Sequence, residues 1–349
     1  MKYRQTGKIT GTLLCAALLL AGCSQEQLYT GSSMADEDIK VYAIVAKAEG
    51  NPYNELMCEG YAQVIEEAGG NCVISYPEEA TAEAQIEVID DLISQGVDSI
   101  TVAANDADAL SDILTEAKEM GIHVTTVDSD VNSDDREIFV NQVAAEEIAA
   151  LLVDAVYDIT GGEGQWAILS ASSQATNQNA WIRAMQEVLE DEKYQDLRLV
   201  DIVYGNDDEE LSAELTEELL EEYPDLKVIC APTSAGIPAV AQVLSAHTES
   251  DVKVTGLGLP SDMAEYVLSD DPVCPCLFLW NPIELGQTAA YVSIALAEEK
   301  ITGKKGETFT AGELGNFQVK ENDSGGTEVI VNSVITFDST NIEEWKELF

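Results

Sequence analysis

Basic residues and histidines are scarce in this chain of 349 residues. Its 17 Lys and Arg are outnumbered by 65 Asp and Glu, so the formal net charge is −48, and the histidines are only two, His123 and His247. Nucleic acid and an anionic membrane surface would both repel such a chain. The shortage of histidine also removes the commonest general base and metal ligand from most catalytic schemes. We expect most of the acidic excess to form a solvated surface.

Motifs of catalysis and nucleotide binding are also missing. Gly256-Leu-Gly258 is too short for a dinucleotide fingerprint, and no Gly-x-Ser-x-Gly nucleophile elbow occurs. A DNA-binding regulator would need a basic module before the first strand, yet residues 24–38 contain no Lys or Arg. We therefore predict no enzymatic activity, no catalytic residue, no cofactor, no metal site and no nucleic-acid partner. A carboxylate pair for glycoside hydrolysis stays an open alternative, because separation in space is not visible in a sequence.

Cysteines beyond Cys15 and Cys23 are few, and their number is odd, so at least one is unpaired in any monomer. They are Cys58, Cys72, Cys230, Cys274 and Cys276. Cys274-Pro-Cys276 lacks the spacing of a thioredoxin-type pair, and no second pair accompanies it to bind zinc. We read these two as buried small side chains, and whether any of the five form a disulfide stays open.

The chain begins with a segment typical of export signals. Three basic residues precede an uncharged apolar run from Ile9 to Leu20, which is too short to span a membrane comfortably. The run ends in Leu20-Ala-Gly-Cys23, which resembles the lipobox of bacterial lipoproteins. The resemblance implies that residues 1–22 are a signal peptide and that Cys23 carries the lipid anchor, followed by a polar tether over 23–38. A plain secretory signal with a chance cysteine is the alternative.

From Lys40 onward, short apolar runs alternate with amphipathic stretches of helical length, the pattern of a parallel sheet covered on both faces. The predicted strands are Val41–Ala46, Cys72–Ser75, Ser99–Ala103, His123–Val127, Trp166–Leu169, Leu199–Tyr204, Val228–Ala231, Lys253–Leu257 and Cys276–Trp280. Roughly nine or ten such β-α units exceed what one sheet usually carries, and a glycine-rich loop at 161–164 lies near the middle. The pattern predicts two α/β domains.

After Trp280 the pattern changes. One helical stretch from Ile283 to Lys300 is followed by β-like segments around Phe309, Phe317 and 329–335, and a last short helix is expected from Asn341. Such a tail could return to the first domain and finish on the second.

The segment Ala167 to Ile182 reads as a strand, a loop and the start of a helix. In a parallel sheet this turn lies at the carboxyl edge of the strands, where ligands bind. Asn177, Gln178 and Asn179 would place neutral donors and acceptors there, which suits an uncharged polyhydroxylated ligand. The alternative is an ordinary helix cap made by Thr176 or Asn177.

A charged pair and several aromatic residues are further candidates. Asp128 directly follows a predicted strand and could accept two sugar hydroxyls, unless it caps a turn. Lys47 could neutralise Asp128 or donate to a hydroxyl, although a lone lysine is more often solvated. Tyr53, Trp181 and Trp280 could stack on the apolar face of a sugar, with core packing as the alternative that we favour for Trp181.

With these motifs the chain resembles the type I periplasmic sugar-binding proteins of ABC transporters, in the branch that holds rhamnose-binding proteins and autoinducer-2 receptors. The resemblance covers nearly all of the chain after the tether and is carried by eight blocks in the same order. These are Lys47, Ala103–Leu110, Val127–Asp130, Asn141–Gln142, Ala167–Ile182, Ala231–Ser234, Val254–Ala264 and Trp280–Gly286.

The resemblance implies two doubly wound parallel-sheet domains joined by a three-strand hinge, with the ligand held between them. The N-terminal lobe would comprise 39–141 plus 282–333, and the C-terminal lobe 142–281 plus 334–349. Crossings are expected near Asn141, near 280–281 and near 334–337. Tyr53 is included as a candidate for stacking on the ligand, and the other residues are implied by the resemblance. The predicted ligand-binding residues are Lys47, Tyr53, Asp128, Asn177, Gln178, Pro232, Ser234 and Asn281.

The implied function is that of a monomeric, lipid-anchored receptor outside the cell membrane that delivers a rhamnose-like neutral monosaccharide to an ABC permease. Autoinducer-2 is the second choice of ligand, and a sensor that partners a membrane signalling receptor is a weaker alternative. Two departures from the family pattern bear on the ligand. Val127 occupies a position that is often Trp in relatives, and Asn177 stands where autoinducer-2 receptors carry an acidic residue.

Overall fold

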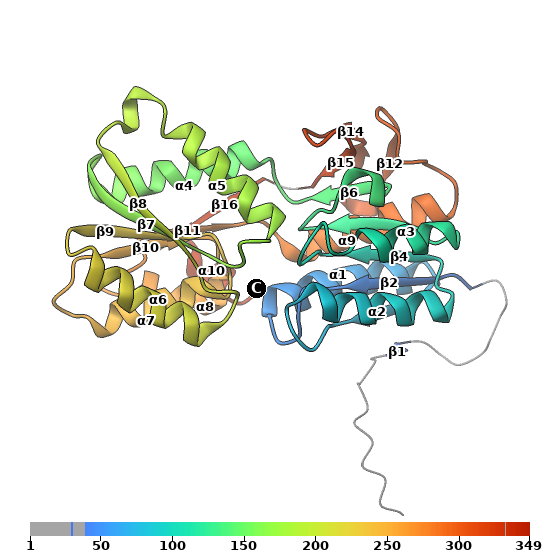
Figure 1. Cartoon of the computed structure of the whole chain (residues 1–349), viewed down its shortest axis with the longest axis horizontal. Helices are drawn as coiled ribbons and strands as arrows, with labels where there is room; N and C mark the ends of the chain where they lie inside the picture. The colour runs from blue at the N-terminus through green and yellow to red at the C-terminus, as the bar shows by residue number, and fades with distance from the viewer. Residues whose placement is uncertain (1–28, 31–38, 332) are drawn as a thin grey trace, which may run out of the picture.

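A computed structural model describes residues 29–30, 39–331 and 333–349 (Figure 1). The predicted signal peptide (1–22), the predicted lipidation site Cys23 and most of the predicted tether lie outside these residues. Within the tether, Tyr29 and Thr30 form a short strand that pairs with the first lobe. None of the helices in the described ranges is both long and apolar enough to cross a membrane.

The first lobe is built on a twisted sheet whose strands run parallel except at its two edges. In spatial order they are β1 (Tyr29–Thr30), β3 (Asn71–Ser75), β2 (Val41–Val45), β4 (Ser99–Val102), β5 (His123–Val127), β6 (Ile138–Asn141), β15 (Thr327–Ile330) and β14 (Lys320–Glu321). Helices α1 (Pro52–Glu67) and α9 (Pro282–Ala297) cover one face, and α2 (Ala82–Gln95) and α3 (Ser111–Glu119) cover the other. A short hairpin of β12 (Thr308–Thr310) and β13 (Asn316–Gln318) extends this lobe.

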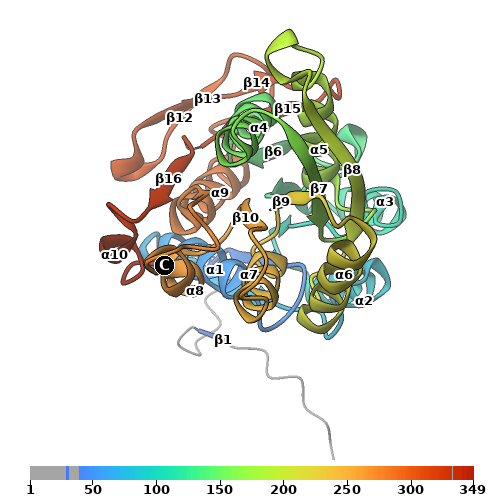
Figure 2. The same ribbon diagram turned by 90° about the vertical axis from the view of Figure 1, so that its left-hand side faces the viewer.

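The second lobe repeats the same plan with a smaller parallel sheet. Its strands, in spatial order, are β10 (Lys253–Gly256), β9 (Leu226–Ala231), β7 (Gly164–Ser170) and β8 (Leu197–Tyr204), and β11 (Cys276–Leu279) pairs antiparallel with β16 (Ile335–Asp338) beside β10. Helices α4 (Ala145–Thr160) and α5 (Thr176–Val188) lie on one side of the sheet, and α6 (Glu209–Glu222) and α7 (Gly236–Ala246) lie on the other (Figure 2). The remaining helices are α8 (Pro260–Val267) and α10 (Ile342–Trp345), which pack together.

The chain passes between the lobes after β6, between β11 and α9, and between β15 and β16 (Figure 1). The prediction of two doubly wound domains joined by three crossings is therefore confirmed. One strand of the hinge, β6, was not among the predicted strands. Its apolar run, Ile138 to Val140, is only three residues long and follows an irregular acidic stretch. A run of this length is too short to show the periodicity of a strand or a helix.

Helices α1 and α9 pack backbone against backbone on the first sheet. A Cβ atom at Gly60 would lie 2.2 Å from the carbonyl oxygen of Ile283, and one at Gly286 would lie 1.8 Å from that of Met57. Only glycine allows so close an approach. Because α1 starts at the cleft and α9 follows the crossing strand β11, this packing also decides where residues at the cleft are placed.

The cysteines of the described chain are all free thiols. Burial raises the pKa of Cys58, Cys72 and Cys230 to about 12, so these thiols stay protonated at neutral pH. Cys274 is also buried, and its Sγ donates to the carbonyl oxygen of Cys276 at 3.4 Å. The interpretation of Cys274 as a buried small side chain is confirmed, whereas Cys276 is only partly buried.

Candidate ligand-binding site

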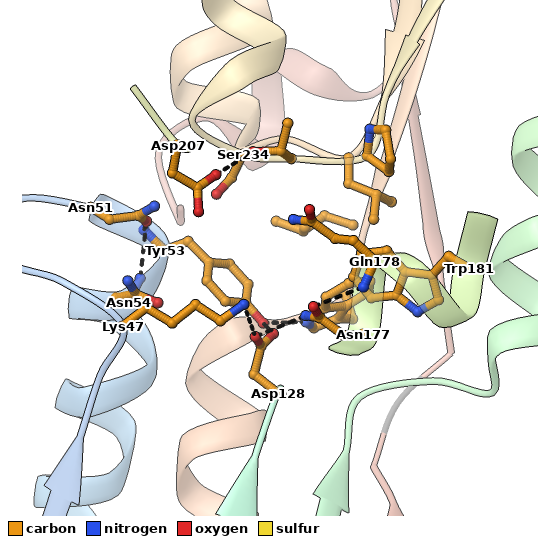
Figure 3. Close-up of a pocket in the computed structure, with 15 residues that line it drawn as sticks. Lys47, Asn51, Tyr53, Asn54, Asp128, Asn177, Gln178, Trp181, Asp207 and Ser234 are labelled. Atoms are coloured by element: carbon orange, nitrogen blue, oxygen red, sulfur yellow. Dashed lines mark hydrogen bonds and ion pairs between the residues drawn. The ribbon is translucent and has the colours of Figure 1, made fainter. Parts of the chain in front are cut away.

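A cavity lies between the two lobes, where loops that follow the carboxyl ends of strands from both sheets meet (Figure 3). It is lined by Lys47, Asn51, Tyr53, Asn54, Asp128, Asn177, Gln178, Trp181, Asp207, Pro232, Thr233, Ser234, Leu257, Leu279 and Trp280. Of the eight residues predicted from sequence, all but Asn281 are in this set.

Asp128 is the polar centre of the cavity. It directly follows β5 with φ of 64°, a left-handed conformation that non-glycine residues seldom adopt. Its Oδ1 accepts a hydrogen bond from the Tyr53 hydroxyl at 2.9 Å, and its Oδ2 accepts one from Asn177 Nδ2 at 3.0 Å. Lys47 Nζ lies 3.3 Å from Oδ2, so the predicted neutralisation of Asp128 by Lys47 is what the structure shows.

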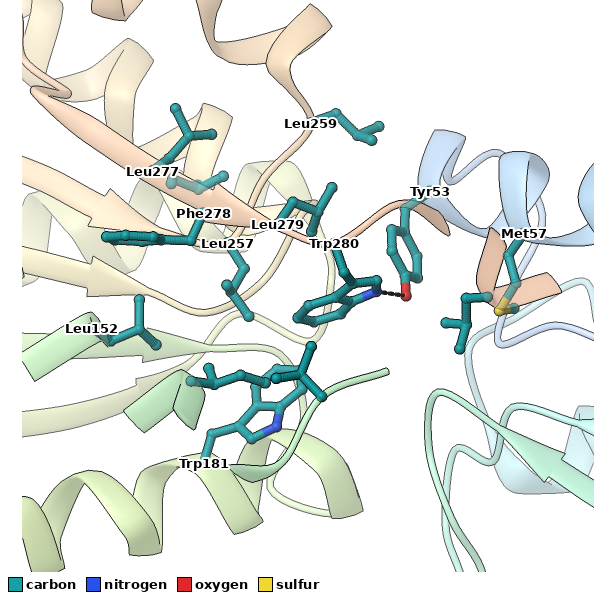
Figure 4. Close-up of a cluster of buried hydrophobic side chains, with 14 of the residues drawn as sticks. Tyr53, Met57, Leu152, Trp181, Leu257, Leu259, Leu277, Phe278, Leu279 and Trp280 are labelled. Atoms are coloured by element: carbon teal, nitrogen blue, oxygen red, sulfur yellow. Dashed lines mark hydrogen bonds between the residues drawn. The ribbon is translucent and has the colours of Figure 1, made fainter. Parts of the chain in front are cut away.

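The Tyr53 hydroxyl connects Asp128 to the crossing strand. Trp280 Nε1 donates to this hydroxyl at 2.7 Å, and the two rings meet edge to face with centroids 6.2 Å apart (Figure 4). Burial and the nearby charge of Asp128 raise the pKa of Tyr53 well above its ordinary value. The phenol therefore stays protonated and remains a donor. Stacking of Tyr53 on a sugar stays a prediction, and the structure shows that its hydroxyl donates to Asp128.

The start of α5 supplies two amides with different tasks. Asn177 Oδ1 accepts from the backbone N–H of Gln178 at 2.8 Å while its Nδ2 reaches Asp128 in the other lobe. Gln178 Oε1 accepts from Ser170 Oγ and from the backbone N–H of Ala171, both at 2.8 Å. The oxygen of Gln178 thus holds the β7–α5 loop. No bond within the described chain engages its Nε2, which is left as a donor for a ligand.

The alternative that Thr176 or Asn177 merely caps α5 is only partly right. The N-cap residue is Ala175, which makes no side-chain cap, and Thr176 Oγ1 instead donates to the carbonyl oxygen of Asp130 at 3.0 Å. Thr176 and Asn177 therefore both reach from the second lobe to the loop after β5 in the first lobe. These contacts bring the two lobes together directly over the cavity.

The loop that receives these contacts is braced from behind by a buried ion pair. Arg136 donates from Nε and an Nη atom to both carboxylate oxygens of Asp130, at 2.8 and 2.6 Å, and its side chain is fully buried. Bidentate pairs of this kind fix geometry as well as charge. A third donation, to the carbonyl oxygen of Thr327, ties the same arginine to β15. The loop after β5 is thereby held at one position relative to the sheet.

One wall of the cavity is apolar. Trp181 is buried in the core, as predicted, and its ring also packs against that of Trp280 with centroids 5.7 Å apart. Leu257 and Leu279 extend the same surface (Figure 4). Pro232 also lines the cavity. Such a wall can hold a methyl group or the apolar face of a small ring.

Asn281 lies next to the cavity but not among the residues that line it. Its Oδ1 accepts from the backbone N–H groups of Ile283, at 3.0 Å, and Glu284, at 3.3 Å, so it caps α9. Asn followed by Pro at the first helical position is a usual helix start, a signal that the sequence analysis did not weigh.

Four polar residues that line the cavity were not among the predicted binding residues: Asn51, Asn54, Asp207 and Thr233. Asn51 caps α1 through its Oδ1, and Asn54 lies one helical turn further on, nine-tenths or more buried. Asp207 follows the end of β8 within an acidic run, where it resembles surface charge. Its place three residues past the end of β8, at the carboxyl edge of the second sheet, is the signal in the sequence that points to Asp207.

The model of the periplasmic binding protein domain matches residues 42–302 of this chain, well over half of its length. The chain belongs to this family. As a periplasmic binding protein it is related to receptors and not to enzymes, which agrees with the expectation from its missing catalytic motifs. It is 22% identical over 260 residues to the D-ribose/D-allose-binding protein of Pseudomonas aeruginosa, a match that covers 71% of this chain and 80% of that protein.

Solved structures of periplasmic binding proteins are also similar. A solute-binding protein of an ABC transporter from Clostridium phytofermentas, with bound L-rhamnose, is 50% identical, with a TM-score of 0.87 and coverage of 89% of this chain and 99% of that one. The LsrB protein of Clostridium saccharobutylicum in complex with AI-2 is 24% identical, with a TM-score of 0.81 and coverage of 87% and 99%. The second likeness shows the fold alone.

Proposed function

We propose that this periplasmic binding protein is the extracytoplasmic receptor of an ABC transporter and that it binds a neutral deoxyhexose, with L-rhamnose as the first choice. The observation that carries the proposal is the position of Asp128. A carboxylate surrounded by neutral donors and one ammonium, in a cavity between two lobes, is suited to accept sugar hydroxyls.

The charges of the cavity favour a neutral ligand. Among the described residues that line it, Lys47 alone is positively charged, and it is already paired with Asp128 at 3.3 Å. A sugar acid or a phosphate would need more than one free cation, usually arginine. The amides of Asn177 and Gln178 can serve hydroxyl groups, which both donate and accept.

The apolar wall favours a sugar that carries a methyl group. Leu257 and Leu279 have no hydrogen-bonding group in their side chains, so a hydroxyl placed against them would lose its water without finding a partner. A C6 methyl group incurs no such cost. The L-rhamnose bound to the solved relative at 50% identity supports the same choice.

Calorimetry on the purified protein tests this function with L-rhamnose, L-fucose, D-ribose, D-galactose and autoinducer-2. We expect L-rhamnose to bind most tightly, and at 100 times its Kd it should raise the free energy of unfolding by about 2.7 kcal/mol. Tight binding of autoinducer-2 with no heat from any sugar would overturn the choice of ligand in favour of the second candidate. Silence toward the whole panel would overturn the sugar-binding proposal.

We further propose that the receptor is lipid-anchored through Cys23, because small residues precede this cysteine as in a lipobox. Changing Cys23 to Ala should move the protein from the membrane fraction to the soluble extracytoplasmic fraction. Cys15→Ala, which changes the other cysteine of the leader, is the matched control and should stay with the membrane. An unchanged distribution of the Cys23 variant after fractionation would contradict the anchor.

A further inference from the structure

We propose that Asp207 is a second ligand-binding carboxylate of this site, which accepts a hydrogen bond from one particular hydroxyl of the bound sugar at the mouth of the cavity. The inference rests on the proposed sugar-binding function. It assigns to the second lobe a charged, specificity-determining residue opposite Asp128 of the first lobe.

The location of Asp207 is the first support. Two grooves lead from the central cavity, and Asp207 and Lys47 line both of them as well as the cavity itself. Lys47 belongs to the first lobe and Asp207 to the loop between β8 and α6 of the second, so the two charges flank the mouth from opposite sides. Figure 3 shows the Asp207 carboxylate directed into the space beside Ser234.

One oxygen of the Asp207 carboxylate is hydrogen-bonded to the protein, and the other is available to a ligand. Its Oδ1 accepts from the hydroxyl of Thr233 at 2.6 Å, and that hydroxyl in turn accepts from the backbone N–H of Gly236 at 3.3 Å. Within the described chain, Oδ2 has no hydrogen-bond or ion-pair partner. Helix capping does not account for Asp207, because the neighbouring Asp208 caps α6 through the backbone N–H of Leu211.

The backbone holds Asp207 at this place despite strain. Asn206 and Asp207 have φ of 53° and 54°, the left-handed region that non-glycine residues avoid. Hydrogen bonds from the backbone N–H of Gly205 to Ser170 O and from that of Asn206 to Ala171 O, both at 2.8 Å, maintain the conformation. Gln178 Oε1 also accepts from Ser170 and Ala171. The loop before Asp207 and the side chain of Gln178 are therefore held by the same two residues at the end of β7. Strain of this kind is typical of ligand sites.

A side-chain amide of the first lobe lines the same cavity. Asn54 is 4% exposed, and its side-chain amide makes no hydrogen bond to any part of the chain that the structure describes. Its amide atoms are not fully enclosed by protein, so they can donate to and accept from a polar ligand group in the cavity. Asn54 and Asp207 thus form a second polar region, which can contact hydroxyls that Asp128 does not.

A cycle of variants and ligand analogues tests the proposal. Calorimetry compares L-rhamnose with its 2-, 3- and 4-deoxy analogues in the wild type, Asp207→Ala and Asp207→Asn. We expect Asp207→Ala to weaken L-rhamnose binding at least tenfold and to erase the wild-type preference for the hydroxyl at one position only. Asp207→Asn, which keeps an acceptor for Thr233, should lose less. Glu210→Gln, an exposed charge change on α6, should match the wild type.

The outcomes separate the role of Asp207 from the function on which it rests. Equal binding by Asp207→Ala and the wild type would overturn the inference, and so would an equal loss for all analogues, which marks a structural role. Circular dichroism of each variant identifies misfolding. If Asp207→Ala is misfolded, the deoxy analogues are compared in Asp207→Asn and the wild type instead. A wild type that binds no sugar overturns the proposed function, and this inference with it, before any variant is made.

Discussion

Sugar binding is expected to fall by about 30-fold to several thousand-fold when Asp128 is replaced by Ala, which corresponds to about 2–5 kcal/mol for removing one partner of a buried charged network. The loss is large because the change deprives several donors at once. Lys47 Nζ, the Tyr53 hydroxyl and Asn177 Nδ2 lie within 3.3 Å of its carboxylate. Ser129 Oγ, at 3.2 Å, and Gln142 Nε2, at 3.4 Å, also donate to it. The ligand would lose its acceptor, and these donors would be left in the cavity without a partner.

A second variant separates binding from stability. In Asp128→Ala the ammonium of Lys47, whose side chain is 12% exposed, loses its counter-ion, so the free energy of unfolding should fall as well. Adding Lys47→Met removes the unpaired charge and should restore part of the stability but none of the binding. Asp134→Ala, an exposed charge on the same lobe, is the control. Calorimetry and thermal unfolding measure both effects, and binding within threefold of wild type in Asp128→Ala would contradict the role of this residue.

Replacing Gly286 by Ala is expected to destabilise the first lobe by about 3 kcal/mol, the upper part of the range for an overpacked core. The added Cβ would lie 1.8 Å from the carbonyl oxygen of Met57 and 3.0 Å from the backbone nitrogen of Tyr61. Both are backbone atoms of α1, so no side chain can rotate away and the helices must separate. The gain in helix propensity from Gly to Ala, about 1 kcal/mol, is too small to compensate.

The same change should weaken ligand binding at a distance. Helix α1 carries Tyr53 to the cavity, and α9 follows Trp280 of the crossing strand, so separating the helices strains the 2.7 Å bond between these two side chains. Urea unfolding monitored by circular dichroism measures the stability, with Glu87→Ala at an exposed position of α2 in the same lobe as the control. If Gly286→Ala unfolds at the same urea concentration as the wild type, the two helices do not depend on this close approach.

Local patterns decided the strands and the residues that follow them. The run from His123 to Val127 has the observed bounds of β5, because its four consecutive β-branched residues favour an extended strand. Asp128 could then be placed at the carboxyl edge of the sheet, and Asn177 and Gln178 at the start of a helix. For these residues the position along the chain was sufficient.

Only the tertiary structure decided which of these groups meet and what each does. Asn177 and Asp128 are 49 residues apart and belong to different lobes, yet they lie 3.0 Å from each other. The cap that Asn281 makes on α9 likewise became visible only in the structure. Asp207, in an acidic run, differs from solvated charge only because Thr233 and the neighbouring loop hold it at the mouth.

The sequence by itself determined the two α/β lobes, the family and most of the polar residues at the strand ends, because these follow from short-range periodicity and local motifs. The tertiary structure alone decided the network around Asp128, the contacts of Gln178 with the β7–α5 loop, and the place of Asp207. These depend on how three crossing strands orient one lobe against the other and on how the glycine-mediated contact places α1 and α9 within the first lobe. No local pattern encodes that orientation, since it arises from packing between residues far apart in the chain.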